Sequence, residues 1–372
     1  MASKYIINST TLTSLANATR SLVDKTNSFT PAQMISEINN YRQEQAYIPP
    51  AQYYNNTTIT AINNYKVSIV GTNAFRGCTK LSNVILSSCN YVDAYAFTGC
   101  TSLKSVYIGG YGSVYIGPEA FYSCTSLERF ECSKATTFSC FGLYDNAFYG
   151  CTSLKIISLP LVTSINDSFF NNLDGNVKNK VTTITMYNLT SIFSNMFSNF
   201  TALNTIAFNN CTRIGSSAFY TCTALKTILF SKCTQIFNNA FENCSSLTTV
   251  GFSECNEIRN SAFKNCSRLT NLTFPKCTNI YANAFQSCTA LTSASFPKCM
   301  QIYANAFQGC RSLSYLYLNQ VTRVPNLVSV DAFDNTPLSA GGRGTIYVPN
   351  SLLASFKTTR NWSLISARLS GR

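Results

Sequence analysis

Ten cysteines follow one another at an unbroken spacing of eleven residues in the second half of the chain. No catalytic or metal site needs such a series, whereas self-similarity at a fixed period is typical of repeat architectures. Because each 22-residue unit carries two of these cysteines, the spacing predicts a solenoid of 22-residue coils. The series consists of Cys211, Cys222, Cys233, Cys244, Cys255, Cys266, Cys277, Cys288, Cys299 and Cys310.

One unit, residues 258–277, shows how a coil is expected to fold. Its second half alternates apolar and polar residues around Leu272 and Phe274, which is the pattern of a β-strand. Short strands that recur once per coil stack as a parallel sheet along one face. The first half carries an Ala-Phe pair at 262–263, which we expect to lie in a helical turn on the return path with the phenylalanine ring in the core.

Phenylalanine recurs at the same place in every unit. The spacing is 22 residues except where insertions lengthen it to 24, 26 or 27. Twelve such positions predict about 12 coils. They are Phe75, Phe97, Phe121, Phe148, Phe170, Phe197, Phe219, Phe241, Phe263, Phe285, Phe307 and Phe333.

The pattern Leu-x-x-Leu-x-Phe-x-x-Cys at 269–277 resembles the core segment of leucine-rich repeats, and Ala-Phe-x-x-Cys at 262–266 resembles the BspA-like, treponemal type. The resemblance covers roughly residues 66–338. It implies a curved solenoid that binds partners on its sheet or edge, without naming the ligand. The expected fold is an α/β repeat: a right-handed, curved leucine-rich-repeat solenoid with one parallel β-sheet face.

The composition argues against several classes of function. The chain contains no histidine, which removes the commonest general base and metal ligand, and its 15 acidic residues face 28 basic ones. The basic residues form no dense cluster of the kind that tracks phosphates. We therefore expect no catalysis, metal, cofactor or nucleic-acid partner, while the net charge of +13 favours approach to polyanionic surfaces. No apolar run approaches the length of a membrane span, so membrane insertion is not expected either.

The seventeen cysteines leave two alternatives open. Their odd number, and positions that follow the repeat, favour reduced and buried thiols. Cysteines of one column on adjacent coils would lie about 4.8 Å apart, a separation at which disulfides also form.

The repeat predicts four segments: an N-terminal helical module at 1–45, a lead-in at 46–66, the solenoid at 67–338 and a cap at 339–372. Apolar residues at helical spacing predict two short helices within residues 11–40. Residues 14–38 resemble a helical module common in tail-associated proteins of phages and prophages. The candidate attachment residues are Leu15, Leu22, Phe29, Met34 and Ile38.

Segments at both ends of the solenoid could serve to cover its apolar core. The N-terminal helices could serve only to cover the apolar end of the first coil. At the other end, the single tryptophan, Trp362, is expected to plug the last coil.

Tyrosines supply the candidate ligand contacts. The outward strand positions between 205 and 295 are small and bland, whereas Tyr107, Tyr187, Tyr315 and Tyr317 could stack on sugars or anchor a protein. The alternative is that exposed tyrosine simply suits β-strands. Two insertions, at 109–112 and 136–142, are expected to emerge along one edge, and they add Tyr111 and Phe138 to the candidates.

These features lead to two main hypotheses. The first is a non-catalytic, receptor-binding tail protein of a phage or prophage virion, assembled in the host cytoplasm. Its partners would be a host-surface protein or glycan and other tail subunits, and a homo-oligomer is a further candidate assembly. The alternative is a BspA-like cell-surface adhesin of a bacterium or protist. A third reading, a tail enzyme that cleaves envelope polysaccharide, needs paired carboxylates that the sparse acids do not supply.

Overall fold

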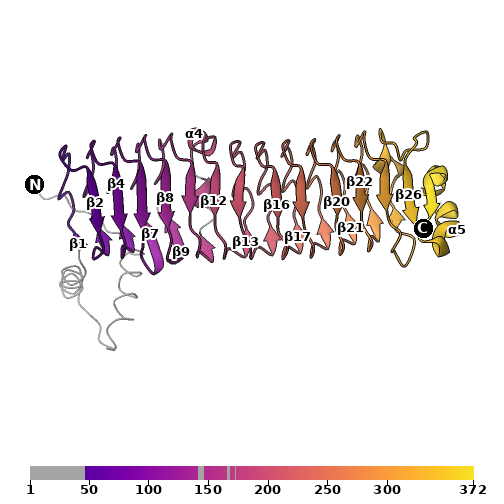
Figure 1. Ribbon diagram of the computed structural model, residues 1–372, viewed down its shortest axis with the longest axis horizontal. Helices are drawn as coiled ribbons and strands as arrows, with labels where there is room; N and C mark the ends of the chain where they lie inside the picture. The colour runs from indigo at the N-terminus through magenta and orange to yellow at the C-terminus, as the bar shows by residue number, and fades with distance from the viewer. Residues whose placement is uncertain (1–46, 141–145, 166–167, 172) are drawn as a thin grey trace, which may run out of the picture.

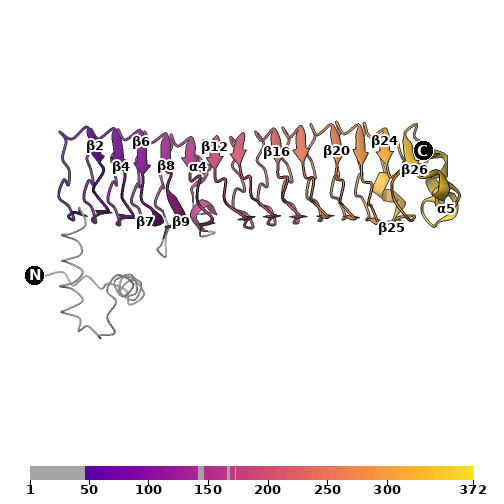
Figure 2. The ribbon, with the colours of Figure 1, turned by 60° about the horizontal axis from the view of Figure 1, so that its bottom comes forward.

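The computed structural model describes residues 47–140, 146–165, 168–171 and 173–372. Figures 1 and 2 show them as a straight row of coils. Each coil places one strand in a parallel ladder, which we name the main ladder, and nearly every coil places a second strand in another parallel ladder, which we name the lateral ladder. The chain is therefore a parallel β-solenoid, mostly strand with little helix.

The main ladder consists of the longer strands. They are β2 (Ala61–Asn64), β4 (Asn83–Leu86), β6 (Ser105–Ile108), β8 (Arg129–Cys132), β10 (Ile156–Ser158), β12 (Thr183–Thr185), β14 (Thr205–Ala207), β16 (Thr227–Leu229), β18 (Thr249–Gly251), β20 (Asn271–Thr273), β22 (Ser293–Ser295), β24 (Tyr315–Tyr317), β26 (Thr345–Val348) and β27 (Leu369–Gly371). In the regular coils the register steps by one repeat, so that Thr227 pairs with Thr249.

The lateral ladder consists mainly of two-residue strands. They are β1 (Tyr47–Ile48), β3 (Ile69–Val70), β5 (Tyr91–Val92), β7 (Gly112–Ile116), β9 (Ala135–Cys140), β11 (Ser164–Ile165), β13 (Ser191–Ile192), β15 (Arg213–Ile214), β17 (Gln235–Ile236), β19 (Glu257–Ile258), β21 (Asn279–Ile280), β23 (Gln301–Ile302) and β25 (Asn326–Leu327). The prediction of a single sheet face was wrong because a run of two residues is too short to show alternation in the sequence.

The solenoid has about 14 turns, not 12. The main ladder is divided into sheets of seven, two and five strands. The extra turns lie at the ends, where another aromatic residue replaces phenylalanine: Tyr53 stacks on Phe75 with ring centres 5.0 Å apart, and Trp362 packs against Phe333 at 6.2 Å. Residues 47–64, expected in a lead-in, belong to the first coil. The predicted count failed because it relied on phenylalanine alone.

The return path is built of turns rather than a helical turn. The Phe263 N–H donates to Ala284 O of the next coil at 2.8 Å, whereas the following Lys264 N–H donates to Ser261 O of its own coil at 3.1 Å. This alternation places Ser261 and Asn265 in the left-handed region, with φ of 56° and 62°. Asparagine tolerates that region better than most residues, which explains the polar residues that flank each Ala-Phe pair.

These turns also explain why the solenoid is straight and not curved as expected. Curvature arises when one side of a coil is wider than the other, as when helices 8–10 Å apart lie behind strands about 4.8 Å apart. Here the main ladder, the lateral ladder and the return path are all hydrogen-bonded from coil to coil. Every side therefore advances by one strand spacing, and the row stays straight in both views (Figures 1 and 2).

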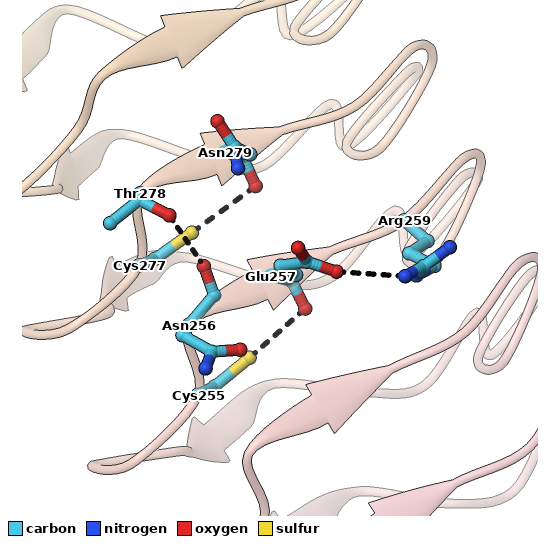
Figure 3. Close-up of polar contacts among 7 residues, drawn as sticks. All are labelled: Cys255, Asn256, Glu257, Arg259, Cys277, Thr278 and Asn279. Atoms are coloured by element: carbon cyan, nitrogen blue, oxygen red, sulfur yellow. Dashed lines mark hydrogen bonds and ion pairs between the residues drawn. The ribbon is translucent and has the colours of Figure 1, made fainter.

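Phenylalanine rings and thiols fill the space between the ladders. Phe241 and Phe263 stack with ring centres 5.2 Å apart, and the return-path Cys266 donates its S–H to Phe241 O of the preceding coil at 3.2 Å. In the other column, Cys255 donates to Glu257 O at 3.3 Å within the turn that leaves the strand (Figure 3). All seventeen cysteines are buried free thiols, which is the alternative that the repeat favoured.

The insertions lie partly in strands. Gly112 begins β7, and residues 136–140 lie in β9, which pairs with β7, whereas residues 109–111 form a loop and residues 141–142 lie outside the described residues. A further insertion forms the short helix α4 (Gly175–Lys178), whose preceding residue Asp174 accepts hydrogen bonds from Asn176 N and Gly150 N at 2.7 and 3.0 Å. The helix is thereby tied to the preceding coil.

The remaining helical segments are short, and most of them lie in the last coils. Trp362 is fully buried, as predicted, and its Nε1 donates to Pro325 O at 2.7 Å. The other helical segments are α3 (Ser168–Asn171), η1 (Val330–Phe333), η2 (Asn350–Leu352), α5 (Leu353–Thr358) and η3 (Ser363–Arg368).

Candidate functional site

The outward positions of the main ladder form the candidate ligand surface. In most strands the first and third residues face outward and the residue between them enters the core. From β14 to β22 these outward residues are small, as predicted, except Leu229, which is 67% exposed. Such a surface offers hydroxyl and amide groups but little apolar area.

This surface changes at β24, where Tyr315 and Tyr317 stand side by side. Tyr317 stacks on Tyr347 of β26 with ring centres 5.1 Å apart and planes 15° from parallel, and Tyr315 lies 6.4 Å from Tyr347. The Arg372 guanidinium lies 5.8 and 5.5 Å from the ring centres of Tyr317 and Tyr347, so it sits beside the stacked pair. We name Tyr315, Tyr317, Tyr347 and Arg372 the tyrosine cluster.

The rings of this cluster expose faces as well as edges. Tyr317 and Tyr347 are neighbours across paired strands and their rings are stacked, so both ring planes lie across the long axis of the solenoid. On its other side, Tyr317 pairs with Ser295 and Tyr315 pairs with Ser293. A serine side chain is too short to cover a phenol ring. The ring faces turned toward β22 are therefore left partly uncovered: Tyr315 is 45% exposed and Tyr317 is half-buried.

The other predicted tyrosines lie apart from this cluster. Tyr107 faces outward on β6, with its hydroxyl 2.7 Å from Ser133 Oγ. Tyr187 lies in the turn after β12, 43% exposed. Tyr111 is 67% exposed, and Lys134 Nζ donates to its hydroxyl at 2.8 Å. The structure thus places Tyr315 and Tyr317 together on β24, and it brings the hydroxyls of Tyr107 and Tyr111 to the adjacent residues Ser133 and Lys134.

Phe138 is not a ligand contact. It is 1% exposed and packs edge to face against Phe130 and Phe169, with ring centres 5.9 and 5.2 Å away. The prediction treated 136–142 as a loop, whereas within β9 the alternation of the strand turns Phe138 into the core.

A second assembly of arginine and aromatic side chains was missed. It follows the lateral ladder at 22-residue steps: Phe237, Arg259, Tyr281 and Tyr303 each come directly after a strand. The Arg259 guanidinium lies 4.9 and 5.9 Å from the ring centres of Phe237 and Tyr281, and Tyr281 stacks on Tyr303 at 4.8 Å. The period that revealed the core columns would have revealed this one as well.

Phe237 and Arg259 each have a further charged partner. The guanidinium of Arg213, on β15, lies 4.4 Å from the Phe237 ring centre. Arg259 Nη2 is 2.9 Å from Glu257 Oε2 (Figure 3). Phe237 is therefore contacted by two guanidinium groups. We name Arg213, Phe237, Arg259, Tyr281 and Tyr303 the lateral arginine–aromatic ladder.

The thiols are poorly suited to chemistry. Burial raises the pKa of Cys211 to about 11 and the pKa of Cys244 and Cys255 to about 12. A protonated, buried thiol is a weak nucleophile and a weak metal ligand. Within the described ranges, histidine, cysteine and acidic side chains form no group that could hold a metal ion.

No helix among the described residues has the length and apolar character needed to span a membrane. The candidate attachment residues Leu15, Leu22, Phe29, Met34 and Ile38 lie outside the described residues.

Comparison with known proteins identifies the repeat. A family model described as "BspA type Leucine rich repeat region (6 copies)" matches residues 46–175, 139–248 and 229–340. The chain belongs to the BspA-type leucine-rich repeat family. This agrees with the repeat pattern at 262–277. None of the curated proteins matches this BspA-type chain in sequence.

Solved structures of leucine-rich repeat proteins resemble this BspA-type solenoid. A leucine-rich repeat protein from Bacteroides ovatus is 24% identical, with 88% of this chain and 87% of that chain covered and a TM-score of 0.50. The T. pallidum Leucine Rich Repeat protein is 26% identical over 44% of this chain and 77% of that chain, with a TM-score of 0.35. A leucine rich cell surface protein from Faecalibacterium prausnitzii is 20% identical over 88% and 86%, with a TM-score of 0.30. The first likeness supports the fold.

Proposed function

We propose that the chain is a non-catalytic binding protein that acts in adhesion at a cell surface, with the tyrosine cluster as its main contact. Membership of the BspA-type repeat family favours this role over a place in a virion tail. The comparisons lend no support to the tail hypothesis, which depended on residues 14–38, outside the described residues.

The observation that carries the proposal is the change of the outward surface at β24. Small residues occupy most outward positions from β14 to β22, and two tyrosines then appear on one strand with Tyr347 beside them. Tyrosine is enriched at the centres of binding surfaces because it offers a large rigid area with one polar end. A strand with two outward tyrosines next to serines is therefore the place where a partner gains most from contact.

Adhesion is tested with beads that carry the purified chain. We expect the beads to be retained on a panel of bacterial and epithelial cell surfaces, and the double variant Y315A/Y317A to lower retention about tenfold or more. Y187A is the matched control, because Tyr187 is equally exposed but lies in a turn away from the cluster. Equal retention of both variants would contradict the proposed contact.

Location is tested separately in cells that produce the chain. We expect an antibody against the solenoid to label intact producing cells. Recovery of the protein only in purified virions, with no labelling of cells, would reverse the choice between the two hypotheses.

A further inference from the structure

The open ring faces of Tyr315 and Tyr317 lie beside each other on one strand. The two residues are two positions apart, so their side chains leave β24 about 6.6 Å from each other, and the ring faces away from Tyr347 turn toward the serines of β22. Aromatic faces carry negative charge density and attract the weakly positive C–H groups of an apolar or saccharide ring face. Two adjacent open faces thus suit a chain of ring-shaped units that lies along the strand.

The surface in front of these rings consists of hydrogen-bonding groups. Ser295 and Ser293 lie directly before the tyrosines, and Thr273 and Asn271 follow on β20. Ser293 Oγ donates to Asn271 Oδ1 at 2.7 Å. Among the described residues, no hydrogen bond engages the hydroxyls of Thr273 and Ser295. A ligand that stacks on the rings therefore meets hydroxyls able both to donate and to accept.

The side chains around the cluster carry only positive charge. The outward residues of β20, β22, β24 and β26 are all uncharged, and the exposed Arg372 is not ion-paired to any described carboxylate. Residues 335–372 contain five lysines and arginines and no acidic residue. The last two acids of the chain, Asp331 and Asp334, lie on the return path, where Asp331 accepts a hydrogen bond from Asn305 N.

We infer that the tyrosine cluster binds an acidic polysaccharide, with sugar rings stacked on Tyr315 and Tyr317 and a uronate carboxylate bound by Arg372. The inference rests on the proposed binding function and names its ligand class. A protein anchor needs an apolar, fully desolvated pocket, whereas this surface joins open rings to hydroxyls. Guanidinium binds carboxylate through two parallel hydrogen bonds, and charge complementarity favours an acidic chain over a neutral one.

Isothermal titration with uronic-acid polymers tests the inference. The probes are polygalacturonate, alginate and hyaluronan, each compared with its carboxyl-methylated ester. We expect at least one acidic polymer to bind, and its ester to bind about fivefold more weakly because an exposed charge pair contributes up to about 1 kcal/mol. Y315A and Y317A should each weaken binding about tenfold, as expected when a stacked ring of up to about 1.5 kcal/mol is lost.

Two variants separate stacking from charge. R372Q should weaken binding of the acid but leave binding of the ester unchanged. S295F places a ring in front of Tyr317 and should block binding while the tyrosines stay in place, so a folding defect of the alanine variants does not decide the outcome. The control variant Y54A alters a tyrosine that is 49% exposed in the first coil, and it should bind as the unaltered chain does.

The inference would be overturned if none of the three polymers bound, if Y315A/Y317A bound them normally, or if poly-glutamate bound as well as the uronates. These results are distinct from those of the adhesion test. Bead retention that depends on Tyr315 and Tyr317, together with no uronate binding, would leave the proposed function standing and remove only this ligand class.

Discussion

The tyrosine cluster and the lateral arginine–aromatic ladder both combine arginine with aromatic residues, and they differ in how much ring surface they leave exposed. In the lateral arginine–aromatic ladder, Phe237 has guanidinium groups at 4.4 and 4.9 Å, and Tyr281 lies between Arg259 and Tyr303. In the tyrosine cluster, Tyr317 is stacked on one side only, and the other side meets serine. Where large side chains stand at the same position in successive coils, each covers the ring face of the next. Where a large side chain has a small neighbour on the next coil, its ring face stays exposed.

The comparison suggests how a repeat of this kind acquires a binding site. The rings and guanidinium groups of the ladder contact one another, so the ladder should stabilise the solenoid. The cluster should contribute more to binding than to stability. The changes below test this difference by their effect on the free energy of unfolding, from the largest expected effect to the smallest.

Alkaline pH should produce the largest change, because both assemblies depend on the same buried thiols. A free thiol has a pKa of about 8.5, whereas burial raises the pKa of Cys211 to about 11 and that of Cys244 to about 12. Above about pH 8.5 the unfolded chain loses protons that the folded chain keeps, so the free energy of unfolding falls as pH rises. Well below that pH, these thiols should leave the free energy of unfolding unchanged.

The expected size follows from the number of thiols. Each thiol with a raised pKa contributes up to about 1.4 kcal/mol per pH unit above its unfolded pKa, and the pKa of fifteen described thiols is raised. A stability of about 5–15 kcal/mol should therefore be lost between about pH 8.5 and about pH 9.5. Circular dichroism under reducing conditions would follow it, with both assemblies lost together. Intact strands at pH 11 would contradict the expectation.

R259A should have the next largest effect. It removes two cation–π contacts worth about 0.5–1 kcal/mol each and leaves Glu257 without its partner, so we expect a loss of about 1–2 kcal/mol. Urea denaturation measures it. R311A is the matched control, because Arg311 is exposed and is not part of the ladder, and it should change stability by less than about 0.5 kcal/mol. Equal effects of the two variants would remove the ladder's stabilising role.

Y315A should have the smallest effect on stability, below about 0.5 kcal/mol, because Tyr315 is 45% exposed and only distantly stacked. Y317A should lose about 1 kcal/mol, since it gives up the 5.1 Å stacking on Tyr347. The same urea experiment measures both. A loss of several kcal/mol from Y315A would show that the cluster stabilises the fold as the ladder does.

Much of the fold could be predicted from the sequence, because a repeat supplies its own internal comparison. The columns of Phe263 and Cys266 correctly indicated a stacked core, and apolar Leu173 and Phe200 in two cysteine positions showed that the column is buried. The parallel main ladder followed from alternation at Leu272 and Phe274.

What the sequence did not reveal depends on backbone geometry. Two-residue strands carry no alternation, and the turns at Ser261 and Asn265 resemble a helical turn until their φ values are known. The candidate site was found in part: Tyr315 and Tyr317 were identified from strand alternation, but Tyr347 and Arg372 join them only through pairing of β24 with β26 and the position of the chain after β27.

Equal advance on every side of the coil has a mechanical consequence. With about 4.8 Å per coil, the thirteen steps from β2 to β27 hold the two ends of the main ladder about 60 Å apart. A rod of this kind acts as a ruler, since deletion of one 22-residue unit from its middle should shorten its reach by a single strand spacing without re-aiming its tip. The number of coils would then set the distance between the first coil and the tyrosine cluster without changing the cluster itself.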